Sequence, residues 1–112
     1  MKRIEAIIRE EKLDTVRESL TEVGYYGMTV TEVSGRGKQG GITIQWRVED
    51  YQVHFLPKLK IEIVVLDEDV DRIVAKIMHS ARTGERGDGK IFVMPVENAY
   101  RIRTGESGND AI

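Results

Sequence analysis

Hydrophobic residues alternate with polar ones in several short segments, the pattern typical of half-buried β-strands. In residues 3–8, Ile4, Ala6 and Ile8 share one face, and the same alternation recurs strictly in residues 59–65. Residues 28–33, rich in Thr and Val, and residues 91–96 are predicted as two further strands.

Two other segments have helical spacing. Residues 12–23 carry an apolar stripe that ends before Gly24. Residues 70–81 carry a wider one, formed by Val70, Ile73, Val74, Ile77, Met78 and Ala81. The resulting order βαββαβ predicts an α+β, ferredoxin-like sandwich spanning residues 1–112 as a single domain, with two helices on one face of a four-stranded antiparallel sheet.

The second face of this sheet is also partly apolar. Val33, Val64, Leu66, Phe92 and Met94 are expected on it or near its edges. An exposed apolar face usually marks an interface, and small domains gain stability by symmetric association. We therefore expect a homo-oligomer.

Composition excludes several classes of function. The 112 residues contain no cysteine and two histidines, so neither a thiol nucleophile nor a Cys or His metal cluster is expected. A net charge of −2 disfavours nucleic acid as a partner. The N-terminal residues lack the apolar core of a signal peptide and no run is long enough to span a bilayer, so a soluble, cytoplasmic protein is expected.

The segment Thr83 to Lys90 carries the clearest chemical signal. It places Gly84, Gly87, Gly89 and Lys90 directly before a strand. Backbone N–H groups of such a loop can form an anion-binding concavity, to which lysine adds a positive charge. The spacing also matches a P-loop, but Ile91 stands where magnesium requires Ser or Thr, and a helix precedes the loop where a strand is needed. A phosphate cradle and an ordinary Gly-rich turn are the two interpretations.

Residues 37–55 are too many for a tight turn between strands. Alternation changes register around Glu49 and Asp50, as in a protruding β-hairpin. The hairpin either inserts into a partner or folds back on its own aromatic residues.

Residues 101–105 read Arg-Ile-Arg-Thr-Gly. Alternation predicts that Arg101 and Arg103 lie on one face of an extended segment, where two guanidinium groups suit a polyphosphate. A solvated edge is the alternative, and residues 104–112 are expected to form a flexible tail.

Five blocks of the chain resemble the PII nitrogen-signalling proteins of the GlnB and GlnK type. The most specific one is Thr-x-x-x-Gly-Asp-Gly-Lys-Ile-Phe-Val at residues 83–93. The others begin at Gly27, Gly35, Phe55 and Arg101. All five align without a gap, and the resemblance extends across essentially the full length of the chain.

The resemblance implies a homotrimer that binds ATP or ADP between neighbouring subunits, with residues 37–55 as the effector arm called the T-loop. Phosphates would contact Gly87, Asp88, Gly89 and Lys90, with Arg101 and Arg103 from the neighbouring subunit. The adenine end would be lined by Thr29, Glu62 and Val64, and the base of the arm by Gly35, Gly37 and Lys38. Lys38 stands where arginine is common in the family. Lysine keeps the positive charge but lacks the forked guanidinium group that binds phosphate through two hydrogen bonds. Gln39 would complete the coordination of Mg²⁺, and Lys58 would pair with 2-oxoglutarate.

The resemblance also implies partners. The arm would dock on an ammonium transporter of the Amt class, recruiting the protein reversibly to the membrane, and Arg47 would block the pore. Regulation of a nitrogen-assimilation enzyme is the alternative target. Tyr51 aligns with a tyrosine that some members carry uridylylated, but Val48 and Glu49 replace the small residues of that motif, so a simple partner contact explains Tyr51 equally well.

Three functions are compared. A regulatory binding protein without catalytic residues accounts for the glycine loop, the arginines and the long arm. A slow ATP-hydrolysing enzyme would need a group that positions water, and Asp88 and Glu62 are the only carboxylates expected near the cleft. An oligomeric scaffold leaves these three features unexplained.

Overall fold

A computed structural model describes residues 1–36 and 56–112 of the chain. The strands are β1 (Lys2–Ile8), β2 (Thr29–Gly35), β3 (Leu56–Val65) and β4 (Lys90–Pro95), and the helices are α1 (Leu13–Glu22) and α3 (Val70–Ala81). Short 3-10 turns at Glu10–Lys12 and Asp67–Asp69 lead into the two helices, and a third occupies Gly108–Ala111. The predicted βαββαβ order is confirmed.

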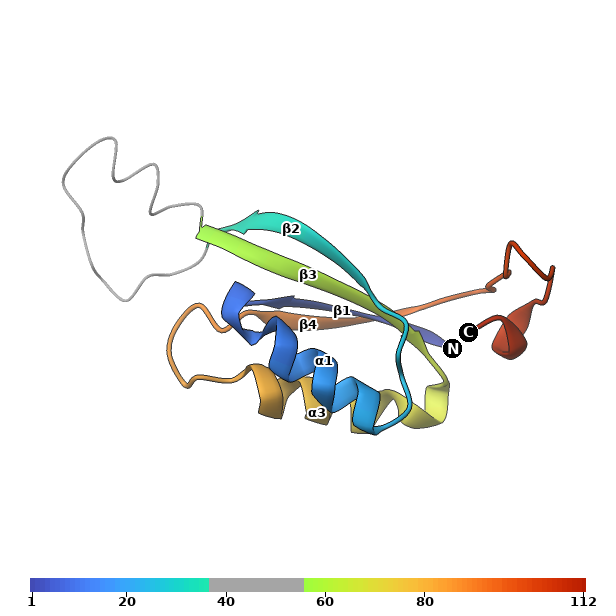
Figure 1. Ribbon diagram of the computed structural model, residues 1–112, viewed down its shortest axis with the longest axis horizontal. Coiled ribbons are helices and arrows are strands. Elements are labelled where there is room, and N and C mark those ends of the chain that lie inside the picture. Colours follow the sequence, from blue (N-terminus) through green and yellow to red (C-terminus); the bar gives the residue numbers. More distant parts are fainter. Residues whose placement is uncertain (37–55) are drawn as a thin grey trace.

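The four strands form one antiparallel sheet in the order β2-β3-β1-β4. Both helices lie on the same face of it, as predicted for a ferredoxin-like sandwich (Figure 1). β3 begins three residues earlier than predicted because Leu56, Pro57 and Lys58 pair with the end of β2. That pairing depends on a distant strand and is invisible in local alternation.

The core lies between the sheet and the helices. The inward residues of β1 are Ile4, Ala6 and Ile8, and each is at most 1% exposed. Facing side chains come from both helical stripes and from β3, namely Val16, Leu20, Ile73, Ile77, Ile61 and Val65. Alternation along the strands thus predicted the buried face correctly.

The other sheet face, which no helix covers, is more charged than the sequence suggested. The strand register brings Glu5, Lys60 and Glu62 together at its centre. Lys60 Nζ lies 3.6 Å from the Glu5 carboxylate and 3.3 Å from that of Glu62. Phe92 is 48% exposed on the same face. We call this surface the open face; it combines a central ion cluster with exposed apolar side chains.

The segment after β4 corrects one prediction. Arg101 and Arg103 do not lie on an extended strand, because the chain turns back between Tyr100 and Ser107, which form a β-bridge. The Arg101 N–H donates to the Glu106 carbonyl, and the Gly105 N–H donates to the Arg101 carbonyl, each at 2.8 Å. Both arginines are exposed on this turn. The flexibility expected for residues 104–112 stays a prediction.

In residues 1–36 and 56–112 no helix has the length and apolar character needed to cross a membrane. The predicted hairpin at residues 37–55 lies outside the described residues.

Candidate functional site

The loop between α3 and β4 is organised around one carboxylate. Asp88 Oδ2 accepts the backbone N–H groups of Thr83 and Gly84, each at 2.9 Å. Its other oxygen accepts the Thr83 hydroxyl and, at 3.0 Å, Arg9 Nε. The Thr83 hydroxyl in turn accepts the Glu85 N–H at 3.1 Å. The loop is therefore closed by its own side chains.

These hydrogen bonds, first of all that from the Thr83 hydroxyl, hold the pKa of Asp88 well below its usual range. The carboxylate stays ionised and faces its own loop. Asp88 was predicted among the phosphate contacts. Because its carboxylate is engaged within the protein, only its backbone is available to a ligand.

Two cationic side chains at the ends of strands donate hydrogen bonds to carbonyl groups of the loop. Arg9, directly after β1, donates from Nη2 to the Arg86 carbonyl at 2.7 Å. Lys58 Nζ donates to the Gly87 carbonyl. Lys58 is 8% exposed, and burial, followed by repulsion from Arg9, lowers the pKa of its amine. Arg9 and Thr83 were not among the predicted site residues, although Thr83 begins the recognised motif.

Gly87 and Gly89 have φ angles of +95° and +105°, a region that other residues avoid. At Gly89 space matters as well, because a Cβ there would lie 1.7 Å from the Ile7 carbonyl oxygen. The glycines therefore let the loop approach β1 closely just before Lys90 pairs with Ile7.

A pocket of about 430 Å³ opens beside this loop on the open face. The ends of β2 and β3 contribute Gly35, Arg36 and Lys58, and the loop contributes Gly87, Gly89 and Lys90; Ile7, Val33, Ser34 and Phe92 complete the lining. Three of these residues are cationic, so the pocket suits an anionic ligand with an apolar portion.

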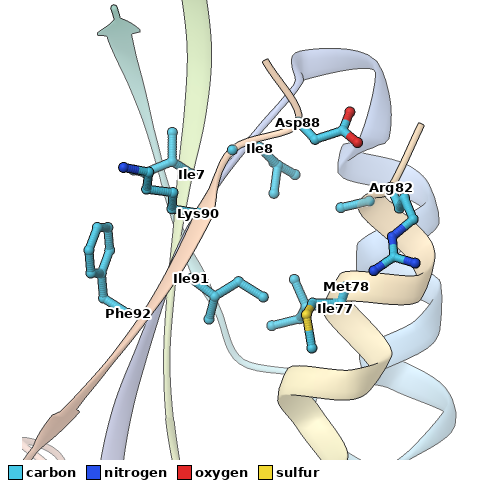
Figure 2. Close-up of a pocket in the computed structure, with 11 residues that line it drawn as sticks. Ile7, Ile8, Ile77, Met78, Arg82, Asp88, Lys90, Ile91 and Phe92 are labelled. Atoms are coloured by element: carbon cyan, nitrogen blue, oxygen red, sulfur yellow. The ribbon is translucent and has the colours of Figure 1, made fainter. Parts of the chain in front are cut away.

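A second pocket, of about 410 Å³, lies on the helix side of β4. Figure 2 shows Ile91 pointing from β4 toward Ile77 and Met78 of α3, while Phe92 points to the other side of the strand. Its wall is mainly hydrocarbon, with Arg82 at one side (Figure 2). The predicted ligand residues Gly35 and Lys58 belong to the open-face pocket alone.

The remaining predicted residues that the structure describes lie from the centre of the sheet toward its opposite end. Thr29 pairs directly with Glu62, and Val64 follows on the same face of β3. Six residues of strand separate Lys58 from Val64, which corresponds to about 20 Å. Arg101 and Arg103 belong to the segment that follows β4, and this segment lies at the end of the sheet opposite to the loop between α3 and β4 (Figure 1).

The structure thus divides the described site residues into two groups. The loop-end group comprises Gly35, Lys58, Gly87, Asp88, Gly89 and Lys90. The tail-end group comprises Thr29, Glu62, Val64, Arg101 and Arg103. Within one chain, the loop-end group lies at one end of the sheet, and the tail-end group extends from the centre of the sheet to beyond its other end.

Gly37, Lys38, Gln39, Arg47 and Tyr51 lie outside the described residues, so their predicted roles remain predictions. Within the described part of the chain, no three His, Asp or Glu side chains cluster in a way that could hold a metal ion.

Comparison with known proteins supports the resemblance found in the sequence. The family model described as nitrogen regulatory protein P-II matches residues 1–106. A nitrogen regulatory protein P-II from Pasteurella multocida is 61% identical over 112 residues, which cover 100% of both chains. Nitrogen regulatory protein P-II 2 from Methanothermobacter thermautotrophicus is 59% identical, over 100% of this chain and 97% of its own.

A third relative, the nitrogen regulatory protein P-II of Haemophilus influenzae, is 57% identical over the full length of both chains. The matched regions include both groups of site residues. The chain therefore belongs to the nitrogen regulatory protein P-II family, whose members are regulatory proteins and not enzymes.

Proposed function

We propose that this signal-transduction protein binds ATP or ADP between neighbouring copies of the chain and uses residues 37–55 to act on its targets. Family membership supports the regulatory role. The observation that carries the ligand class is the open-face pocket, in which glycine backbone and the amines of Lys58 and Lys90 converge.

The residues of this pocket fit a polyphosphate. Gly87, Gly89 and Lys90 offer backbone N–H groups in a loop already shaped by Asp88. Lys90 adds an exposed cation at the start of β4. Backbone donors with a lysine are a common way to bind phosphate groups. Ile7, Val33 and Phe92 supply apolar surface beside the cations.

The division of the site supports binding between copies. The loop-end group lies at one end of the sheet, whereas Val64 lies about 20 Å further along β3 than Lys58, and the segment with Arg101 and Arg103 follows the far end of β4. We propose that the nucleotide takes its contacts to the two groups from two neighbouring chains. Pairing the loop end of one copy with the tail end of the next is a heterologous contact, which forms a ring when the rotation between copies closes. A trimer is the ring that we propose.

The edge of β3 near Val64 has features that fit the adenine base of the proposed nucleotide. The ladder between β2 and β3 ends at Thr29 and Glu62, whereas β3 continues to Val65 along β1. The β2-side edge of residues 63–65 therefore has no strand partner among the described residues. Free backbone donors and acceptors beside Val64 match the hydrogen-bonding edge of adenine.

Lys58 is the group that we propose for 2-oxoglutarate, with Gln39 helping to hold Mg²⁺ together with ATP. An ammonium group suits a carboxylate, and the amide oxygen suits a hard cation that itself neutralises phosphate charge. In the structure Lys58 Nζ is engaged by the Gly87 carbonyl. A dicarboxylate at Lys58 would replace this contact and would so be coupled to the loop that holds the phosphates.

The chain connectivity links the ligands to the arm. Gly35 ends β2 and Leu56 begins β3, and Gly35, Arg36 and Lys58 line the pocket, so the strand ends that flank residues 37–55 lie beside it. We propose that Mg-ATP with 2-oxoglutarate favours one geometry of the arm and ADP another. A ligand shifts this equilibrium only by its difference in affinity for the two states.

Mixed oligomers test the shared site. Lys90→Ala removes a loop-end cation, and the double replacement Arg101→Ala with Arg103→Ala removes the tail-end pair. We expect each variant alone to bind ATP at least tenfold more weakly, because charge-assisted contacts contribute on the order of 1.5–3 kcal/mol. Co-expression in equal amounts should restore about a quarter of the high-affinity sites, since random mixing places an intact loop beside an intact tail that often.

The measurement is calorimetric titration with ATP, and oligomers of each variant alone are the control. Complete loss of high-affinity sites in the mixed preparation would argue against a site shared between chains.

For the target we propose an ammonium transporter of the Amt class, with Arg47 entering its pore. Arg47→Ala should abolish the block of ammonium uptake in cells, because a neutral methyl group neither fills nor charges the pore. Lys12→Ala, a change on the helical layer outside residues 37–55, is the control. Uptake that stays blocked with the Arg47 variant would point instead to another target, such as a nitrogen-assimilation enzyme.

The carboxylates at the site give no support to the ATP-hydrolysing alternative. Asp88 is held by its own loop, and Glu62 is paired with Lys60 at the tail end. Neither is free beside the cations of the open-face pocket, where a water-positioning group would be needed.

A further inference from the structure

We propose that Asp88 is a positioning residue: with Thr83 and Arg9 it fixes the phosphate-binding loop before a ligand arrives, and it makes no side-chain contact with the ligand. This inference rests on the proposed nucleotide function and assigns the loop residue that determines affinity for phosphate.

The acceptor capacity of Asp88 carries the argument. A carboxylate offers about four lone-pair sites. In this structure four donors take them: two backbone N–H groups, the Thr83 hydroxyl and Arg9 Nε. A side chain whose acceptors are all used inside the protein has none left for a metal ion or a ligand hydroxyl. Its role is therefore to hold the chain.

Arg9 connects this closed loop to the sheet. It stands 79 positions away in the sequence and follows the last residue of β1. One guanidinium binds the Asp88 carboxylate through Nε and the Arg86 carbonyl through Nη2. Because a planar fork fixes two acceptors at once, it sets both the position and the orientation of residues 86–88 relative to β1.

The consequence is preorganisation. Gly87 and Gly89 adopt positive φ on either side of Asp88. Without the anchor these permissive residues would populate many conformations, and the ligand would have to order them on binding. With the Asp88 anchor, the loop is already ordered in the folded protein, so the ligand does not have to order it and the affinity for phosphate groups is higher.

Thr83 offers a matched pair of variants. Thr83→Val removes the hydroxyl that donates to Asp88 and accepts from Glu85, at almost unchanged volume. Thr83→Ser keeps that hydroxyl. Asp88→Asn keeps the shape and removes the charge that binds Arg9.

The test is titration of each purified variant with ADP and with adenosine at one protomer concentration. We expect ADP to bind about tenfold more weakly to Thr83→Val and weaker still to Asp88→Asn, as for the loss of a charge-assisted hydrogen bond. Thr83→Ser should bind ADP like the wild type. Adenosine, which has no phosphate, should bind all four proteins alike.

Hydrogen exchange of the Thr83 and Gly84 amides gives a second measurement without any ligand. These amides should be protected in the wild type and in Thr83→Ser, and they should exchange faster in the other two variants.

Equal ADP affinities in the wild type and in Thr83→Val and Asp88→Asn would overturn the positioning role. So would a parallel loss of adenosine affinity, since that would indicate general damage to the fold. A wild-type protein that binds neither ADP nor adenosine would overturn the proposed nucleotide function itself, so the two failures are distinguishable.

Discussion

Replacing Gly89 with alanine is expected to destabilise the protein by about 3 kcal/mol or more, since an unfavourable φ and a clash in a packed region each cost roughly 1–3 kcal/mol. The new Cβ would lie 1.7 Å from the Ile7 carbonyl oxygen and 2.7 Å from its carbonyl carbon. Both atoms belong to the backbone of β1, so no side-chain rotation relieves the clash. β4 would have to separate from β1 where Lys90 pairs with Ile7.

The measurement is thermal unfolding followed by circular dichroism, with a decrease in Tm of more than about 10 °C expected for a domain of this size. Gly84→Ala is the matched control, because Gly84 lies in the same loop at φ +89° with no atom within 4 Å of its Cβ position. This variant should lower the free energy of unfolding by only about 1–2 kcal/mol, the cost of a left-handed backbone conformation for alanine. Equal Tm values for the two variants would contradict the close approach at Gly89.

Replacing Lys58 with methionine is expected to weaken 2-oxoglutarate binding roughly 10- to 100-fold, the effect of losing a hydrogen bond to a charged group. Methionine fills the space of the buried lysine stem without the ammonium group. Lys58 is 8% exposed near the start of β3, where it meets the glycine loop, and it shares the pocket with Lys90 of β4, which is exposed. The change therefore removes the dicarboxylate's proposed partner with little loss of packing.

The readout is calorimetric titration with 2-oxoglutarate in saturating Mg-ATP. Lys76→Met on α3 is the control, since its amine lies 3.9 Å from the Glu22 carboxylate in an exposed pair on the helical layer. It should leave 2-oxoglutarate affinity unchanged. If Lys58→Met also leaves that affinity unchanged, Lys58 is not the dicarboxylate partner.

Local patterns in the sequence predicted the fold well. α3 was predicted to its exact ends, 70 and 81, because its apolar stripe is continuous and the glycine loop follows soon after. β1 and β4 differ by one residue at their ends. The charged centre of the open face was missed because only apolar positions were counted on it, while Glu5, Lys60 and Glu62 meet through the register of two strands.

The site was predictable in its residue types and less so in its arrangement. The glycine loop suggested a phosphate cradle, but the partners of Asp88 include Arg9 from the other end of the chain. The tail was predicted as extended from alternation, whereas Thr104 and Arg101 bind Glu106 and close a turn. The missed Arg9 contact and the wrong prediction of an extended segment both concern contacts that depend on tertiary or medium-range structure and leave no periodic signal.

Thr29 of β2 and Val64 of β3 lie toward one end of the sheet and Lys58 lies toward the other, which has a thermodynamic consequence for the proposed function. A nucleotide that contacts the loop-end group of one protomer and the tail-end group of the next, as we propose, is held only by associated protomers. Its apparent affinity therefore falls when the protein is diluted below the dissociation constant of the assembly. By the same linkage the ligand tightens the assembly, and nucleotide supply and subunit abundance become interdependent variables in the cell.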